Sequence, residues 1–130
     1  VLRSISVILN QGAAVVLTSS AVTQRGAAAV SGYAASKAAI EALARSAALE
    51  FAPKKIRVNA VAPGVFKSKM SDKFFRALNQ EQLDALASNH PLGIGTPADV
   101  ANCIKFLLGP ESSWITGQTL IVDGGYSING

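Results

Sequence analysis

The sequence predicts an α/β protein built on a doubly wound parallel sheet, and three observations lead to this prediction. Short apolar, largely β-branched segments at residues 13–17, 56–61 and 119–122 have the composition of strands buried on both faces. Long segments separate them, and crossovers of such length join parallel strands. The intervening segments have helical composition, so we expect three strands with helices on both faces.

The composition is that of one folded domain. The chain has 130 residues, of which 49% are hydrophobic and 15% charged, and this balance argues against disorder. No apolar run approaches the roughly 18 residues of a membrane span, so no membrane association is predicted. The start of the chain lacks the features of a secretory signal. We therefore expect a cytoplasmic protein.

The charges and the single cysteine exclude several classes of function. The net charge is +4, but the cations are scattered rather than gathered on one face, so no nucleic-acid partner is predicted. The basic groups at residues 54–57 and 67–73 are interpreted as solvated surface. Cys103 cannot form an internal disulfide, and His90 has no second ligand at metal-binding spacing, so no metal site is predicted.

The first half of the chain is predicted to contain two helices and two strands. Residues 1–10 carry apolar side chains at helical spacing and end at Asn10-Gln11-Gly12, which predicts a helix before the strand at 13–17. Residues 31–51 are rich in Ala, Leu, Glu and Lys, which predicts a long helix that Pro53 ends. The strand at 56–61 then runs into the turn residues Pro63-Gly64.

The second half continues the same alternation. Residues 68–89 are polar and helical in composition. Thr96 is a candidate N-cap, with Pro97 at the first helical position, for a helix that extends to Leu108. The strand at 119–122 ends at Asp123-Gly124-Gly125, a turn sequence.

Polar residues follow the first strand at the position where a parallel sheet binds its ligands. In such sheets the site lies at the carboxyl ends of the strands, and Ser19-Ser20 follows the strand at 13–17. Tyr33 and Lys37 are one helical turn apart and share a helix face. We predict that Ser20, Tyr33 and Lys37 form a proton-transfer site.

Each of these three residue types has a chemical use at such a site. A phenol ordinarily ionises near pH ~10, and a neighbouring ammonium favours its phenolate form. A serine hydroxyl can stabilise negative charge that develops on a substrate oxygen. The Tyr-x-x-x-Lys spacing alone is weak evidence, because such pairs also occur as ordinary helix packing.

Four motifs together make the sequence resemble the short-chain dehydrogenase/reductase family. They are VVLTSSA with Ser20, YAASKAAIEALARSAALE with Tyr33 and Lys37, IRVNAVAPG with Pro63 and Gly64, and ITGQTLIVDGGYS. The resemblance implies a Rossmann-like fold. It also implies that NAD or NADP exchanges hydride with a small-molecule carbonyl or alcohol substrate.

The resemblance assigns roles to individual residues. Ser20 would polarise the substrate oxygen, Tyr33 would donate or accept the proton, and Lys37 would also bind the nicotinamide ribose. Cofactor contacts are implied for Tyr33, Lys37, Pro63, Gly64, Phe66 and Ser68. Residues 66–90 correspond to the substrate lid of the family.

Other parts of the family pattern are missing from residues 1–130. The Gly-rich turn that binds the pyrophosphate and the catalytic Asn of the family are absent, so the chain resembles the carboxyl-terminal half of a reductase. We expect these residues alone to be inactive, and the choice between NAD and NADP stays open. The resemblance implies a homodimer or homotetramer for the complete protein.

Two alternatives remain open at this point. The first is a non-catalytic assembly partner of a longer reductase, an alternative favoured by the Ala-rich helix, which suits packing between subunits. Among substrates, a 3-oxoacyl carrier-protein is one candidate, and a sugar, steroid or small ketone is another.

Overall fold

The computed structural model of the chain describes residues 7–69 and 71–129. Its centre is a parallel sheet in the order β1 (Ala14–Thr18), β2 (Arg57–Pro63) and β3 (Thr119–Val122). Val16 lies opposite Asn59, and Val61 lies opposite Leu120. The predicted three-stranded parallel sheet is confirmed.

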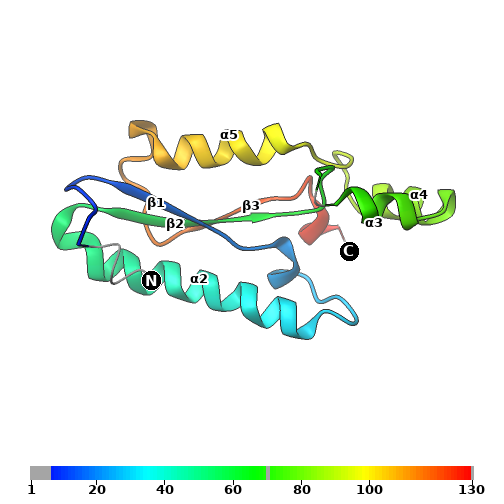
Figure 1. Cartoon of the computed structure of the whole chain (residues 1–130), viewed down its shortest axis with the longest axis horizontal. Coiled ribbons are helices and arrows are strands. Elements are labelled where there is room, and N and C mark those ends of the chain that lie inside the picture. Colours follow the sequence, from blue (N-terminus) through cyan, green and yellow to red (C-terminus); the bar gives the residue numbers. More distant parts are fainter. Residues whose placement is uncertain (1–6, 70, 130) are drawn as a thin grey trace.

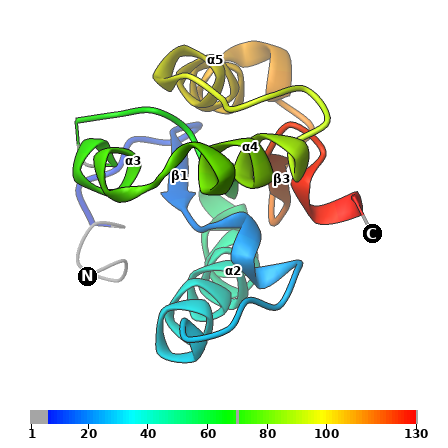
Figure 2. The same cartoon turned by 90° about the vertical axis from the view of Figure 1, so that its right-hand side faces the viewer.

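Helices cover both faces of this sheet, as predicted. Helix α2 (Ser31–Phe51) lies on one face and α5 (Pro97–Leu108) on the other (Figure 1). The short helices α3 (Asp72–Ala77) and α4 (Gln80–Ser88) lie beyond the carboxyl ends of the strands, and Figure 2 views the molecule from that end. None of the helices in the described ranges is both long and apolar enough to cross a membrane.

Four short 3-10 helices complete the described fold: η1 (Ala21–Thr23), η2 (Ala52–Lys54), η3 (Pro110–Ser112) and η4 (Tyr126–Ile128). Helix α5 begins as predicted, with Pro97 in its first turn. A reciprocal capping box joins Thr96 and Asp99. The Thr96 hydroxyl and amide donate to Asp99 Oδ2, both at 2.7 Å, and they lower the pKa of this carboxyl.

The sheet separates two apolar cores because successive strand residues point to opposite faces. On the α2 side, Val58 and Ala60 of β2 are fully buried together with Phe51 of the helix. On the α5 side, Val61 packs with Leu107. This alternation fixes which polar side chains at the strand ends face each helix.

The helix predicted for residues 1–10 is wrong for the part that the structure describes. Residues 1–6 lie outside the described residues, whereas residues 7–10 form a turn and coil. The side chains of Val7 and Ile8 are 80% and 77% exposed. A short helix is stable only when its apolar face packs against another surface. The exposed side chains at residues 7 and 8 have no such surface in the described part of the chain, so apolar spacing alone was not enough to predict a helix.

Arg57 corrects the interpretation of residues 54–57 as solvated surface. Its guanidinium is part-buried and donates from Nη1 to Leu107 O at 2.7 Å and to Ser112 Oγ at 2.8 Å. Its Nη2 donates to Gly109 O at 2.9 Å. The residue joins the first position of β2 to the carboxyl end of α5.

Candidate functional site

A cleft of about 400 Å³ opens at the carboxyl ends of β1 and β2 on the α2 side of the sheet. Four of its lining residues, Ser20, Tyr33, Pro63 and Gly64, belong to the predicted site. They come from the turn after β1, the first turn of α2 and the end of β2. The fold therefore brings these four predicted residues together.

Ser20 begins the turn that follows β1. Its extended backbone forms the N-cap of η1, and its Oγ accepts a 3.4 Å hydrogen bond from the amide of Val22. Among the described residues its hydroxyl donates to no protein acceptor. A substrate oxygen in the cleft can therefore receive the Ser20 proton as a hydrogen bond.

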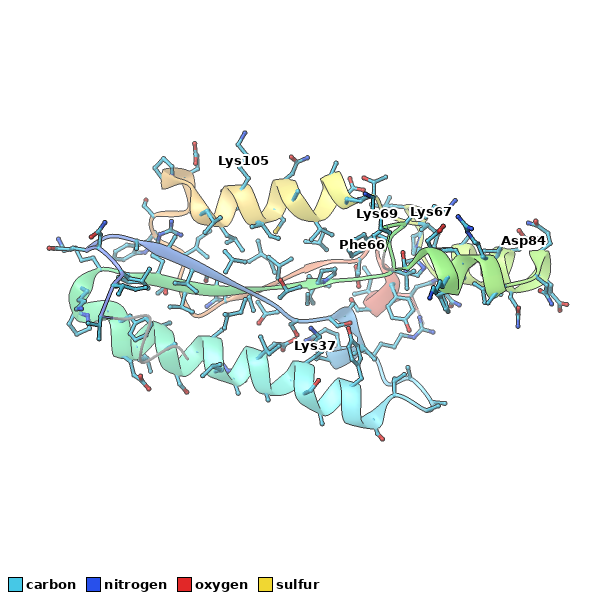
Figure 3. The ribbon with its side chains drawn as sticks, in the orientation of Figure 1. Lys37, Phe66, Lys67, Lys69, Asp84 and Lys105 are labelled. Carbon is cyan, nitrogen blue, oxygen red and sulfur yellow. The ribbon has the colours of Figure 1, made fainter. Side chains whose placement is uncertain are left out.

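Tyr33 and Lys37 meet as their spacing predicts. The ring of Tyr33 is half-exposed, and Lys37 Nζ lies 5.6 Å from the ring centroid. Nζ also donates to Thr18 O at 3.1 Å, so it lies between α2 and the end of β1 (Figure 3). This places a positive charge beside the phenol at the edge of the cleft.

Gly64 is required here by close packing. A Cβ at this position would lie 2.7 Å from both Cα and Cβ of Asp123, much closer than carbon atoms can approach. The amide of Gly64 donates to Val122 O at 2.9 Å. The turns after β2 and β3 are therefore in direct contact beneath the cleft.

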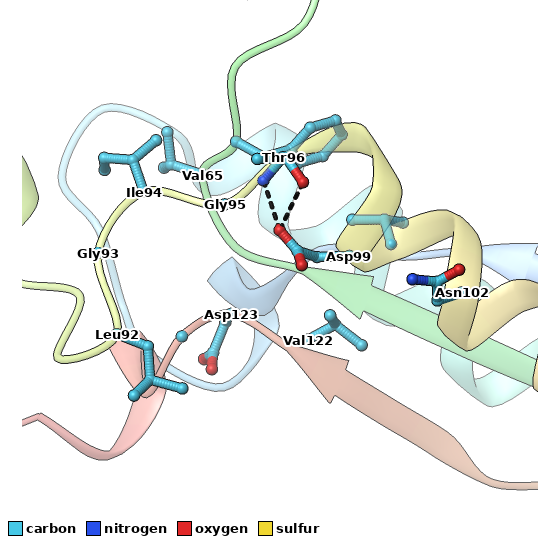
Figure 4. Close-up of a pocket in the computed structure, with 13 residues that line it drawn as sticks. Val65, Leu92, Gly93, Ile94, Gly95, Thr96, Asp99, Asn102, Val122 and Asp123 are labelled. Carbon is cyan, nitrogen blue, oxygen red and sulfur yellow. Dashed lines mark hydrogen bonds between the residues drawn. The ribbon is translucent and has the colours of Figure 1, made fainter.

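Phe66 and Ser68 lie away from this cleft. Phe66 pairs with Gly95 in an isolated bridge and lines a second pocket, of about 430 Å³, on the α5 side (Figure 4). The Ser68 hydroxyl lies 3.2 Å from Ser71 Oγ, and Ser71 also donates to Phe66 O. The structure thus does not group these two residues with Tyr33.

Tyr126 is a cleft residue for which the sequence analysis predicted no role. Its ring stacks on the buried His90 imidazole with centroids 4.9 Å apart, and the Arg25 guanidinium lies 5.0 Å from the same ring. Arg25 Nη1 also donates to Tyr126 O. The three residues are distant in sequence, so no local pattern reveals this stack.

His90 connects the stack to the segment predicted as a lid. Its Nδ1 donates to Leu86 O of α4 at 2.8 Å, which leaves Nε2 buried without a partner among the described residues. Nearby, burial raises the pKa of Asp123, but hydrogen bonds from Ser127 and Gly125 and a coulombic interaction with His90 bring it below its ordinary value.

The residues of the cleft fit a polar ring with a hydroxylated substituent, such as a nicotinamide riboside. Within the described chain, Lys37 Nζ uses one hydrogen bond to protein, and an ammonium has three donor hydrogens. The two remaining donor hydrogens can therefore bind the hydroxyl groups of such a ligand.

Comparison with known proteins identifies the family. A family model described as enoyl-(acyl carrier protein) reductase matches residues 1–127. A short-chain type dehydrogenase/reductase from Mycobacterium ulcerans has a similar structure, with a TM-score of 0.84, 28% identity and coverage of 98% of this chain and 46% of that one. This chain belongs to the short-chain dehydrogenase/reductase family.

A second solved family member, from Francisella tularensis, matches with a TM-score of 0.87 and 28% identity over 98% of this chain and 56% of that one. The family resemblance predicted from the four motifs, and the oxidoreductase class that it implied, are thereby confirmed. The same comparison confirms the Rossmann-like arrangement of the three strands.

Short-chain dehydrogenase/reductase relatives among characterised proteins are similar over most of this chain. A 3-oxoacyl-[acyl-carrier-protein] reductase of Rickettsia bellii is 50% identical over 94 residues, which are 72% of this chain and 37% of the relative. A chloroplastic tropinone reductase homolog of Arabidopsis thaliana is 48% identical over 72% of this chain and 29% of its own length. A cyclohexanol dehydrogenase of Acinetobacter is 38% identical over 89% and 44%. The chain spans less than half the length of each.

Proposed function

We propose that the protein encoded by the complete gene interconverts a carbonyl and a secondary alcohol, with NAD or NADP as the hydride carrier. One observation carries the proposal. Ser20 and Tyr33 line one cleft at the carboxyl ends of the strands, and Lys37 Nζ lies 5.6 Å from the Tyr33 ring. Membership of an oxidoreductase family supports the reaction class.

The chain's own residues handle the substrate oxygen and its proton. In the direction of reduction, Ser20 Oγ donates a hydrogen bond to the carbonyl oxygen and stabilises the negative charge that develops on it. The Tyr33 hydroxyl then transfers its proton to that oxygen, and the Lys37 ammonium favours the phenolate that remains. The cofactor, when bound, supplies the hydride to the carbonyl carbon.

The proposed cofactor contacts comprise two groups. Tyr33, Lys37, Pro63 and Gly64 already lie at the cleft or beside it. Phe66 and Ser68 lie in the segment 66–90, which we propose is the substrate lid. Their contact with a nicotinamide requires this segment to move, which suits its place beyond the sheet and its exposed helices α3 and α4 (Figure 2).

For the substrate we propose a 3-oxoacyl group on a carrier protein. The Rickettsia bellii relative has this reductase activity in its name and matches at 50% identity. The apolar lining of the cleft, which includes Val22, Val30 and Phe74, suits an acyl chain. A tropinone reductase homolog and a cyclohexanol dehydrogenase among the relatives make a cyclic ketone the second candidate. We further propose a cytoplasmic homo-oligomer.

Replacing Tyr33 by Phe tests the reaction. Removal of the proton donor should lower kcat by about 100-fold or more, while the half-exposed ring keeps its packing. The assay is NAD(P)H oxidation with a 3-oxoacyl thioester and with cyclohexanone. Tyr126→Phe also removes a phenol hydroxyl, but elsewhere on the cleft wall, and should lower kcat by less than about tenfold. Undiminished turnover by Tyr33→Phe would contradict the proposal.

A further inference from the structure

Glu41 is a buried carboxylate next to the site that the reaction above does not use. It lies one helical turn after Lys37 on α2, and only 8% of its surface is exposed. Residues four apart on a helix share a face, so the carboxylate is directed to the same strand end as the lysine. Burying a carboxylate is costly unless donors satisfy it.

The donors come from the turn after β1. Ser19 Oγ donates to Glu41 Oε1 at 2.8 Å, and Thr23 Oγ1 donates to the same oxygen at 2.6 Å. Gln24 Nε2 lies 3.4 Å from Oε2. No Lys, Arg or His of the described residues lies within 4 Å of this carboxylate. Neutral donors from a single turn therefore satisfy the carboxylate. Hydrogen bonds to a carboxylate are charge-assisted, and such bonds are strong.

These donors lie on both sides of Ser20 in the sequence. Ser19 precedes it, and the Thr23 hydroxyl also lies 2.8 Å from Ser20 O. The Thr23 amide donates to Ser20 O at 3.1 Å. The position of the Ser20 backbone is thus fixed through the same groups that contact Glu41.

The helix face is fixed to the strand end at a second point. Lys37 Nζ donates to Thr18 O at 3.1 Å, and Ser19 Oγ lies 3.1 Å from Lys37 O. The turn of α2 from Lys37 to Glu41 consequently contacts Thr18 and Ser19 directly, and Thr23 connects it to Ser20. This geometry sets the distance between the serine of the site and the helix that carries its tyrosine.

We propose that Glu41 is a positioning residue that holds Ser20 in register with Tyr33 and Lys37. This inference rests on the proposed function, because the register matters only if the three groups act on one substrate oxygen. A misplacement of about 1 Å at a reacting group can cost about 100-fold in rate. Glu41 itself does not face the cleft and takes no part in proton transfer.

The test compares two substitutions of Glu41 in the protein that the complete gene encodes. Glu41→Ala removes both acceptors and should lower kcat by about 10- to 100-fold with the cofactor Kd changed less than about twofold. Glu41→Gln keeps an acceptor oxygen for Ser19 and Thr23 and should stay within about fivefold of wild type. Thr23→Val, a milder change, should fall between them.

Two controls separate positioning from stability. Glu50→Ala removes an exposed carboxylate from the same helix and should leave kcat unchanged. Phe51→Leu weakens the core at the far end of α2, so it should lower Tm without lowering kcat. A loss of kcat in Phe51→Leu equal to that in Glu41→Ala would overturn the proposal.

A second readout does not depend on activity. In the same complete protein, Glu41→Ala should speed amide hydrogen exchange of Thr23 and Gln24 by about tenfold or more and leave the exchange of α5 unchanged, whereas Glu41→Gln should not speed it. If wild type reduces no carbonyl, the proposed function fails, and this readout still decides whether Glu41 holds the turn. If Tyr33→Phe is inactive but Glu41→Ala keeps kcat within threefold, only the role of Glu41 is overturned. Unchanged exchange overturns it as well.

Discussion

One charged side chain lies at each end of the sheet, and neutral groups satisfy both of them. The two charged side chains have different roles. At the amino end of β2, the Arg57 guanidinium donates to carbonyl oxygens at the end of α5 and to Ser112 Oγ. At the carboxyl end of β1, the Glu41 carboxylate accepts from the hydroxyls of Ser19 and Thr23. Among the described residues neither charge has an ionic partner.

The difference lies in what each charge holds. Arg57 satisfies carbonyl groups that a helix leaves unpaired at its carboxyl end, where the helix dipole favours a cation. Glu41 holds the turn that carries Ser20. We therefore expect the first network to contribute to the free energy of unfolding and the second to contribute mainly to the rate.

Substitution of Arg57 should have the largest effect on stability. Arg57→Met should lower the free energy of unfolding by about 3 kcal/mol, because Ser112 and the carbonyls of α5 lose a charged donor in a part-buried position. The measurement is urea unfolding followed by circular dichroism. Arg45→Met, at an exposed position on α2, serves as the control and should change it by less than about 0.5 kcal/mol. If both substitutions changed the free energy of unfolding equally, Arg57 would contribute no more than an ordinary surface residue.

Ser20→Ala should show the opposite pattern. Loss of the hydroxyl should lower kcat by about 100-fold, or about 2.7 kcal/mol in the activation free energy. Stability should change little, because the Oγ accepts only one long hydrogen bond from Val22. Parallel measurements of kcat and Tm check this expectation. A fall in Tm without a fall in kcat would place Ser20 among the structural residues.

Two matched serine substitutions sharpen the comparison. Ser112→Ala removes a buried hydroxyl from the Arg57 network and should lower the free energy of unfolding by about 1.5 kcal/mol with kcat unchanged. Ser19→Ala removes one donor to Glu41 and should lower kcat by about fivefold, a smaller effect than misplacing the whole turn. If Ser112→Ala lowered kcat and Ser19→Ala lowered only the free energy of unfolding, the proposed difference between the two ends of the sheet would be contradicted.

The smallest expected effect is on the stability of the protein at acidic pH. The pKa of Asp123 is below its ordinary value of 3.8 in the folded protein. Its contribution to stability is therefore present above that value and is lost as the pH falls below it, through the lowered pKa. Asp123→Asn should make the unfolding midpoint in urea less dependent on pH between about 4 and 2. A slope identical to that of wild type would show that Asp123 does not contribute.

Local patterns predicted much of this fold. The helix at 31–51 and the strand at 119–122 have the predicted bounds, since Pro, Gly and β-branched residues mark element ends within a few positions. The spacing of Tyr33 and Lys37 likewise predicted their contact, because a helix fixes the geometry of residues four apart.

Contacts between distant segments could not be predicted in this way. Arg57 and Ser112 are 55 residues apart, and Glu41 and Ser19 are 22 apart. Their pairing depends on how two elements pack, which no local pattern encodes. The failure at residues 7–10 has the same origin, because apolar spacing indicates a helix face without showing whether a partner surface exists.

The contact of Gly64 with Asp123 limits which sequences this site can tolerate. Any side chain at position 64 would push on the turn from Asp123 to Ser127, which also carries Tyr126 of the cleft wall. Variation at one position would thus reshape a loop that lies about sixty residues further along the chain. We infer that the two turns can diverge during evolution only together, through paired changes rather than single ones.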